Sequence, residues 1–126
     1  MRKYIITPAL LAIVCMVMCH CTFNRKASVA ANEYLIQGEL ANLPDSIVIG
    51  LYEEDGSILN CVWRDTLMNG QFSFRDTVST TRKMLIMSDN RGFPGTWLEV
   101  WIAPGEYIEI KGQDKLVKTW EVVSDV

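Results

Sequence analysis

Hydrophobic and polar residues alternate along most of this chain after residue 32, in short runs separated by turn residues. Runs with a period of two are typical of β-strands that have one buried and one exposed face. Phe72 and Phe74 lie two residues apart and share a strand face, while Gln71, Ser73 and Arg75 fall on the other. No stretch after residue 30 keeps a helical period for more than two turns. The pattern predicts an all-β domain.

The alternating runs indicate about seven or eight short strands, spaced about ten residues apart. Glycine, proline, asparagine and aspartate lie between the runs, as they do in turns. This pattern is typical of an antiparallel sandwich or barrel, and the length of the segment suits a single small sandwich. The third strand has an expected interruption near Asn60. We expect strands at residues 33–40, 47–52, 57–68, 71–78, 83–88, 97–103, 107–111 and 116–123.

Glycine marks three places where the backbone is expected to turn or to approach another segment closely. Asn69-Gly70 tolerates the positive φ of a two-residue hairpin turn, so Arg64–Phe74 is predicted to form a β-hairpin. Glu53–Gly56 is predicted to be a solvated turn, because its three consecutive carboxylates lack the alternate spacing of a calcium loop. Gly38, inside the first strand, indicates a bulge or a close backbone approach.

The first 21 residues have the composition of an export signal. Met1-Arg2-Lys3 is a short basic region, and no charged residue follows until Arg25. Ile5–Met18 is mostly Ala, Leu, Ile, Val and Met, as in the apolar region of a signal peptide. We therefore predict an N-terminal signal or anchor helix in a signal peptide at 1–21, a polar linker at 22–32 and an antiparallel β-sandwich domain at 33–126.

Cysteines at the end of the apolar run suggest a lipoprotein signal, in which one cysteine is acylated. Cys21 is the best placed for lipidation, because the apolar run ends there and a polar tether follows, and Cys19 is the runner-up. Neither cysteine has the small preceding residue of a good lipidation site, so an ordinary cleaved signal and an uncleaved anchor are open alternatives. We expect an exported protein, periplasmic or outer-membrane-associated, that is held at a membrane.

No group of residues in the body of the chain indicates catalysis, a cofactor or a metal. His20 is the single histidine, and with its neighbours Cys19 and Cys21 it cannot easily converge on one tetrahedral ion. Cys61 is the single cysteine after the signal, and we expect it to be a small buried apolar residue. The net charge is −3 and basic runs are lacking, which disfavours nucleic-acid binding.

The strand at 97–103 carries a candidate interaction face. Trp97, Glu99 and Trp101 alternate with apolar residues and are expected to share one side of the strand. Exposed tryptophan pairs mark interaction surfaces, and they can also stack on sugar rings. One alternative is that these side chains merely cover a face of the sandwich or pack against a further domain.

Four segments together resemble a known family, the small N-terminal β-domain of unassigned function in thioredoxin-like lipoproteins of Bacteroidetes-type bacteria. The first is Ile36–Ser46, which resembles the opening strand and turn of that domain. Asp65-Thr66 followed by Asn69–Phe74 resembles its central hairpin. Ile102–Ile110 and Val122–Ser124 resemble its late strand-turn-strand and its closing strand.

The resemblance implies an accessory role in the cell envelope. Family members usually continue into a thioredoxin-like domain that holds the redox cysteines, and no such cysteine pair is carried over to this sequence. We therefore expect a non-catalytic accessory or binding domain that tethers or positions a protein partner or a thioredoxin-like redox domain. Two alternatives are an N-terminal fragment of a periplasmic thiol-disulfide oxidoreductase and a carbohydrate-binding module with a glycan partner.

Overall fold

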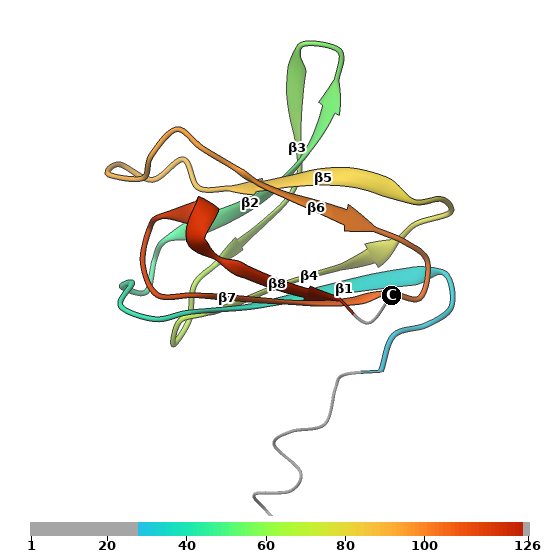
Figure 1. Cartoon of the computed structure of the whole chain (residues 1–126), viewed down its shortest axis with the longest axis horizontal. Coiled ribbons are helices and arrows are strands. Elements are labelled where there is room, and N and C mark those ends of the chain that lie inside the picture. Colours follow the sequence, from blue (N-terminus) through green and yellow to red (C-terminus); the bar gives the residue numbers. More distant parts are fainter. Residues whose placement is uncertain (1–27, 125–126) are drawn as a thin grey trace, which may run out of the picture.

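The computed structural model describes residues 28–124 as two four-stranded sheets that stack face to face (Figure 1). The prediction of an all-β domain with about eight strands is confirmed. The predicted signal helix at 1–21, with Cys19 and Cys21, and most of the linker lie outside the described residues.

Sheet A has the strand order β4–β1–β7–β8, and sheet B has the order β3–β2–β5–β6. The last predicted strand, 116–123, is divided in the structure, because a 3-10 helix, η2 (Val117–Thr119), comes before β8. The strands are β1 (Glu33–Leu40), β2 (Val48–Asp55), β3 (Ile58–Thr66), β4 (Gln71–Thr77), β5 (Arg82–Met87), β6 (Leu98–Ile102), β7 (Tyr107–Gly112) and β8 (Glu121–Ser124).

The hydrophobic core lies between the two sheets, because β1, β2, β4, β5, β6 and β7 turn an apolar face inward. Phe72 and Phe74 point into this core, as predicted, with ring centroids 5.5 Å apart. Their alternate neighbours on β4 include Gln71, Ser73 and Arg75, which are exposed. Side chains that are fully buried between the sheets include Ile36, Leu40, Ile49, Leu51, Leu67, Ile86, Ile102, Ile108, Ile110 and Val117.

Gly38 is the point where β1 makes room for an aromatic ring. It lies opposite Phe72 in the β1–β4 ladder, and a Cβ atom built on it would lie 1.9 Å from Cε1 of Phe72. The Phe72 side chain is only 2% exposed, so surrounding atoms hold the ring in place. The register from Glu33 to Glu39 runs without a shift. The bulge is therefore wrong, and the group that approaches Gly38 closely is the ring of Phe72 instead of another backbone segment.

The segment Arg64–Phe74 contains the predicted tight turn but not the predicted hairpin. Asn69 and Gly70 have φ values of 53° and 74°, and backbone bonds join Met68 to Gln71 in both directions across the turn. Beyond this bridge β3 stays in sheet B, while β4 enters sheet A and pairs with β1. The hairpin prediction is wrong because turn geometry is a local property, whereas β4 finds its ladder on a distant strand.

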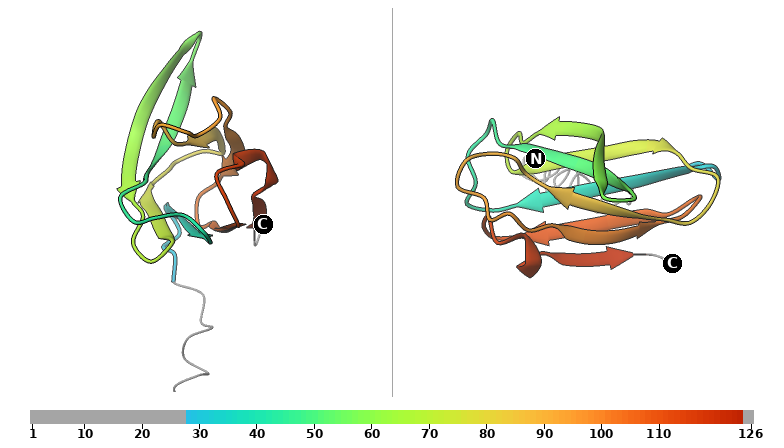
Figure 2. Two further views of the ribbon diagram at one scale, coloured as in Figure 1. Left: turned by 90° about the vertical axis from the view of Figure 1, so that its left-hand side faces the viewer. Right: turned by 90° about the horizontal axis from the view of Figure 1, so that it is seen from above.

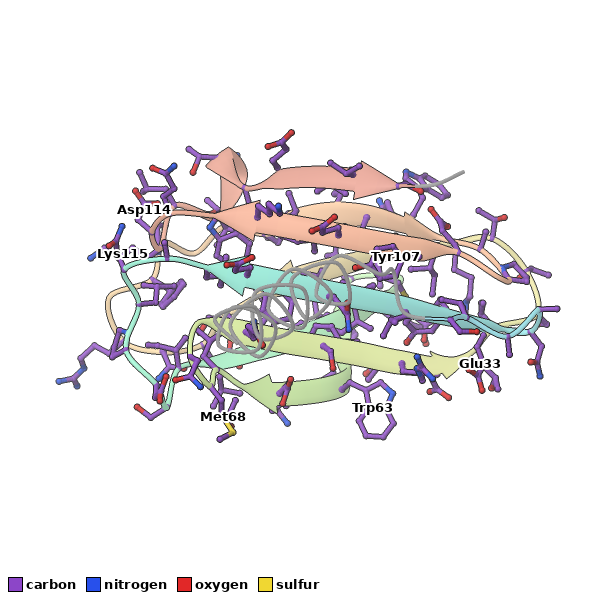
Figure 3. All side chains as sticks on the ribbon, turned by 90° about the horizontal axis from the view of Figure 1, so that it is seen from below. Glu33, Trp63, Met68, Tyr107, Asp114 and Lys115 are labelled. Carbon is purple, nitrogen blue, oxygen red and sulfur yellow. The ribbon has the colours of Figure 1, made fainter. Side chains whose placement is uncertain are left out.

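Side chains hold β3 to β4 where these two strands meet at the corner between the sheets. The Nε1–H of Trp63 donates to Oδ2 of Asp76 at 3.1 Å. The backbone N–H of Ser73 donates to Oδ2 of Asp65 at 2.8 Å. Trp63 lies at this edge of the sandwich in Figure 3. The carboxylates of Asp65 and Asp76 therefore link β3 to β4, although the described parts of these strands share no continuous backbone ladder.

One ladder departs from the predicted antiparallel arrangement. β1 and β7 run parallel, with Leu35 opposite Tyr107. The remaining ladders between described strands are antiparallel, so sheet A is mixed and sheet B is antiparallel. The prediction of a wholly antiparallel sandwich is therefore wrong. Alternation of apolar and polar residues shows which face of a strand is buried but not which way its neighbour runs.

The outer halves of β2 and β3 form a two-stranded arm that rises from sheet B, away from sheet A (Figures 1 and 2). β5 pairs with β2 only between Gly50 and Tyr52, so the arm at 53–60 continues past the sheet. The predicted turn at Glu53–Gly56 begins too early, because β2 runs to Asp55. Strand pairing with β3 and ion pairs to β5 keep these acidic residues extended.

Candidate functional site

The outer face of sheet B carries the candidate residues of β6, which is an edge strand. Val100 and Ile102 of this strand are buried in the core, so Glu99 and Trp101 point to the opposite side. Trp97 comes immediately before β6, at the end of the loop that leads into the strand. Trp97 is 42% exposed and Trp101 is 60% exposed. The structure thus places Glu99 and Trp101 on the solvent side of sheet B and leaves Trp97 exposed just before them.

β5 and β2 extend this face beyond β6. Trp101 is paired with Lys83, and Glu99 is paired with Leu85. Leu85 is paired on its other side with Tyr52 of β2. Leu85 and Tyr52 are both buried, although neither belongs to the core between the sheets. Tyr52 and Leu85 are therefore apolar side chains on the solvent side of sheet B that neighbouring side chains already cover.

An ion-pair network crosses the same face. Nζ of Lys83 lies 3.5 Å from Oε2 of Glu54 on the arm and 4.0 Å from Oε1 of Glu99 on β6. All three side chains are substantially exposed, so each pair stabilises the fold by only about 0–1 kcal/mol. The ion pairs mainly hold the ammonium of Lys83 and the carboxylates of Glu54 and Glu99 in place on this face. Their exposed atoms are still able to form hydrogen bonds with a ligand.

The loop between β5 and β6 is tied to β2. The hydroxyl of Tyr52 donates to Oδ2 of Asp89 at 2.7 Å, and the backbone N–H of Val48 donates to Oδ1 of Asn90 at 2.8 Å. The hydroxyl of Ser88 donates to the carbonyl oxygen of Val48 at 2.6 Å. Burial, followed by the bond to Asp89 and its charge, raises the pKa of Tyr52 to about 12. The phenol thus stays protonated and anchors the start of this loop.

A β-bulge in β3 turns part of the arm toward the same face. Trp63 opposes Leu51 and Cys61 opposes Tyr52, so Val62 is the extra residue of β3. The interruption that we expected near Asn60 therefore lies at Val62. The shift places Cys61 beside Tyr52 on the outward side of the sheet. Cys61 is half-buried there, and our expectation of a buried residue is wrong because its strand has no layer packed over it.

Tyr52, Lys83 and Leu85 are members of this face that the sequence alone does not single out. Their proximity to β6 depends on ladders between strands that are far apart in the sequence. One signal was present, namely the unbroken apolar run Met84–Met87. A strand without alternation has apolar residues on both faces, and here one of those faces is the outer side of sheet B.

Within residues 28–124, no group of histidine, cysteine, aspartate and glutamate side chains is arranged to hold a metal ion. The same part of the chain contains no helix with the length and apolar character needed to cross a membrane. No family model, curated protein or solved structure matches this chain. The candidate site therefore has to be judged on its own chemistry.

Proposed function

We propose that this protein is an exported, non-catalytic binding domain of the cell envelope, and that it holds its partner on the outer face of sheet B. The observation that carries the proposal is the exposure of Trp97 and Trp101 beside the buried side chains of Tyr52 and Leu85. A single exposed apolar residue is ordinary on a protein surface. Two exposed indoles within five residues of the chain are less ordinary, and exposed aromatic side chains of this kind mark interaction sites.

Tryptophan is well suited to this role. Its large ring buries much apolar area on contact while few rotatable bonds are immobilised, and it is enriched among the residues that dominate binding energy. The tied loop from Asp89 and the Lys83 ion pairs hold the surroundings of the indoles in place before a partner arrives. Such preorganisation lowers the entropy cost of binding.

The sequence of the N-terminal segment supports the envelope location. The basic start, the apolar run and Cys21 at its end are features of an exported and membrane-tethered protein. The resemblance to the accessory domain of thioredoxin-like lipoproteins supports a non-catalytic role in the same compartment. The domain would then be displayed on a tether, with the outer face of sheet B open to the surroundings.

Photo-cross-linking in the native host tests the binding surface. Benzoylphenylalanine replaces Trp101 in one variant and Val123 in a control, since Val123 is 51% exposed on β8 of the other sheet. We expect a covalent adduct of reproducible size from position 101 and none from position 123. Adducts from both positions alike would overturn the proposed surface.

Labelling with an alkyne-bearing fatty acid tests the tether. We expect the full-length protein to take up the label and fractionate with membranes, and Cys21→Ala to abolish both. The matched control Cys19→Ala should keep both. Uptake that is insensitive to Cys21→Ala would contradict lipidation at this residue, and recovery of the protein in the cytosol would contradict export.

A further inference from the structure

We propose that the ligand of the outer face of sheet B is a neutral glycan, which lies along β6 and stacks sugar rings on Trp97 and Trp101. This inference rests on the proposed binding function and adds the chemical class of the ligand. It follows from the spacing of the two indoles, from the charged groups between and beside them, and from the cost of covering those groups.

The spacing of the indoles favours an extended oligomeric ligand. Trp97 and Trp101 are four positions apart, and since β6 begins at Leu98 the chain between them spans up to about 13 Å. A single sugar ring cannot reach both side chains at that separation, whereas an oligosaccharide of a few rings can. Glu99 lies midway between the two tryptophans in the sequence, on the same side of β6 as Trp101. The ligand must therefore offer apolar surface at two places and polar groups between them.

A saccharide has this alternation. Each ring exposes C–H groups on its faces and hydroxyl groups around its edge. The C–H faces fit the broad apolar surface of an indole. The hydroxyl groups can donate to the carboxylate of Glu99 and accept from the ammonium of Lys83, and hydrogen bonds to charged groups are about twice as strong as those between neutral groups. Both charged side chains retain exposed surface for this purpose.

A flat protein surface fits the same face less well. The core of a protein interface is depleted in charged residues. Covering this face with protein would strip water from Lys83, Glu54 and Glu99, and burying ion pairs carries a desolvation penalty that their attraction often fails to offset. A glycan replaces the water around these groups with hydroxyls and leaves the rest hydrated. The charge pattern therefore favours a sugar over a protein partner.

The sign of the local charge favours a neutral glycan over an acidic one. Glu54 and Glu99 share one cation, Lys83, and the carboxylate of Asp89 lies next to Tyr52 on the same side of sheet B. Arg64, opposite Gly50, is the other cation that the ladders place on this face. The cations on this face do not outnumber the carboxylates, so it carries no positive excess that would attract uronic acids or sulfate groups.

Affinity electrophoresis of the full-length protein in mild detergent tests the inference. The neutral probes are xyloglucan, glucomannan, mixed-linkage β-glucan, mannan and dextran, and the acidic probes are alginate and polygalacturonate. We expect at least one neutral polysaccharide, and neither acidic one, to retard the protein and to alter its tryptophan fluorescence. Trp97→Ala and Trp101→Ala should each weaken this binding about tenfold or more, whereas Trp101→Tyr should keep most of it.

Trp63→Ala is the matched control, because Trp63 is 47% exposed but lies at the corner with β4 instead of on the outer face. It should leave the affinity unchanged, and thermal unfolding confirms that each variant is folded. Equal losses from Trp63→Ala and Trp101→Ala in folded protein would overturn the assignment of the site. If all neutral probes fail and position 101 cross-links to a protein, the glycan inference is overturned while the binding function stands. If position 101 also gives no adduct, both are overturned.

Discussion

Replacing Gly38 by alanine adds a methyl group where β1 lies against the Phe72 ring of β4. The new Cβ would lie 1.9 Å from Cε1 and 2.1 Å from Cζ of Phe72, whose ring is buried. Overpacking a core costs ~1–3 kcal/mol, and contacts this short place the substitution near the upper limit. Removing the conformational freedom of glycine from a strand offsets ~0.5–1 kcal/mol. We expect a net loss of ~2 kcal/mol in the free energy of unfolding, by combining these two effects.

Urea titration of the purified protein, followed by tryptophan fluorescence, measures this loss. In a thermal melt it corresponds to a fall of ~8–16 °C for a domain of this size. Combining Gly38→Ala with Phe72→Leu gives a sharper result, because a leucine leaves part of the space that the new methyl group needs. The double variant should be more stable than the sum of the two single losses predicts, by ~1 kcal/mol.

Gly95→Ala is the control for the glycine substitution itself. Nothing lies within 4 Å of a Cβ built at Gly95, so we expect a change of less than ~0.5 kcal/mol. Strict additivity of Gly38→Ala and Phe72→Leu would refute the reasoning, because it would mean that the ring does not occupy the space above Gly38. Full stability of Gly38→Ala alone would refute it as well.

Three further predictions concern the corner, the turn and the tyrosines. Trp63→Phe removes the donor to Asp76 and should lower the free energy of unfolding by ~0.5–1 kcal/mol in urea; an unchanged midpoint would show that the bond does not join the sheets. In Gly70→Ala the new side chain meets a φ of 74°, and its Cβ lies 2.5 Å from the carbonyl oxygen of Leu40. This variant should lose ~1–3 kcal/mol of folding free energy and melt at a lower temperature, and an unaltered Tm would contradict the prediction. Burial and then the charge of Asp76 raise the pKa of Tyr34 to about 12, as burial and Asp89 do for Tyr52. The unfolded chain therefore loses these protons near pH 10 while the folded protein keeps them, so stability should fall as the pH rises from about 10 to about 12. Tyr52→Phe should reduce that slope in urea titrations at several pH values, and an unaltered slope would contradict the assignment.

Local features of the fold could be predicted from the sequence. The bounds of β1, 33–40, follow from alternation, and Tyr34 and Ile36 of this strand face the core. The turn at Asn69-Gly70 and the outward position of Trp101 on β6 follow from residue preferences and period alone. Each of these features depends on a few adjacent residues, so the sequence contains the information directly.

Features that depend on distant partners could not be predicted in this way. The parallel pairing of β1 with β7 and the passage of the chain from β3 to a different sheet both depend on which strands meet across the fold. The extension of β2 through Glu53–Asp55 depends on cations of β5. For the candidate site, the exposure of Trp97 and Trp101 could be predicted from the sequence. The burial of Tyr52 and Leu85 beside them and the ion pairs of Lys83 could not.

The position of β1 between β4 and β7 has a consequence for the order of folding. The hydroxyl of Tyr107 on β7 reaches Gln37 on β1 across a separation of 70 residues. β1 leaves the ribosome first, but its edge opposite β4 cannot be paired until β7 has been synthesised. Closing so long a loop makes folding slow compared with that of a domain built from local contacts. During synthesis the β2–β3 arm can form early, whereas sheet A is completed only after β7 and β8 have been made.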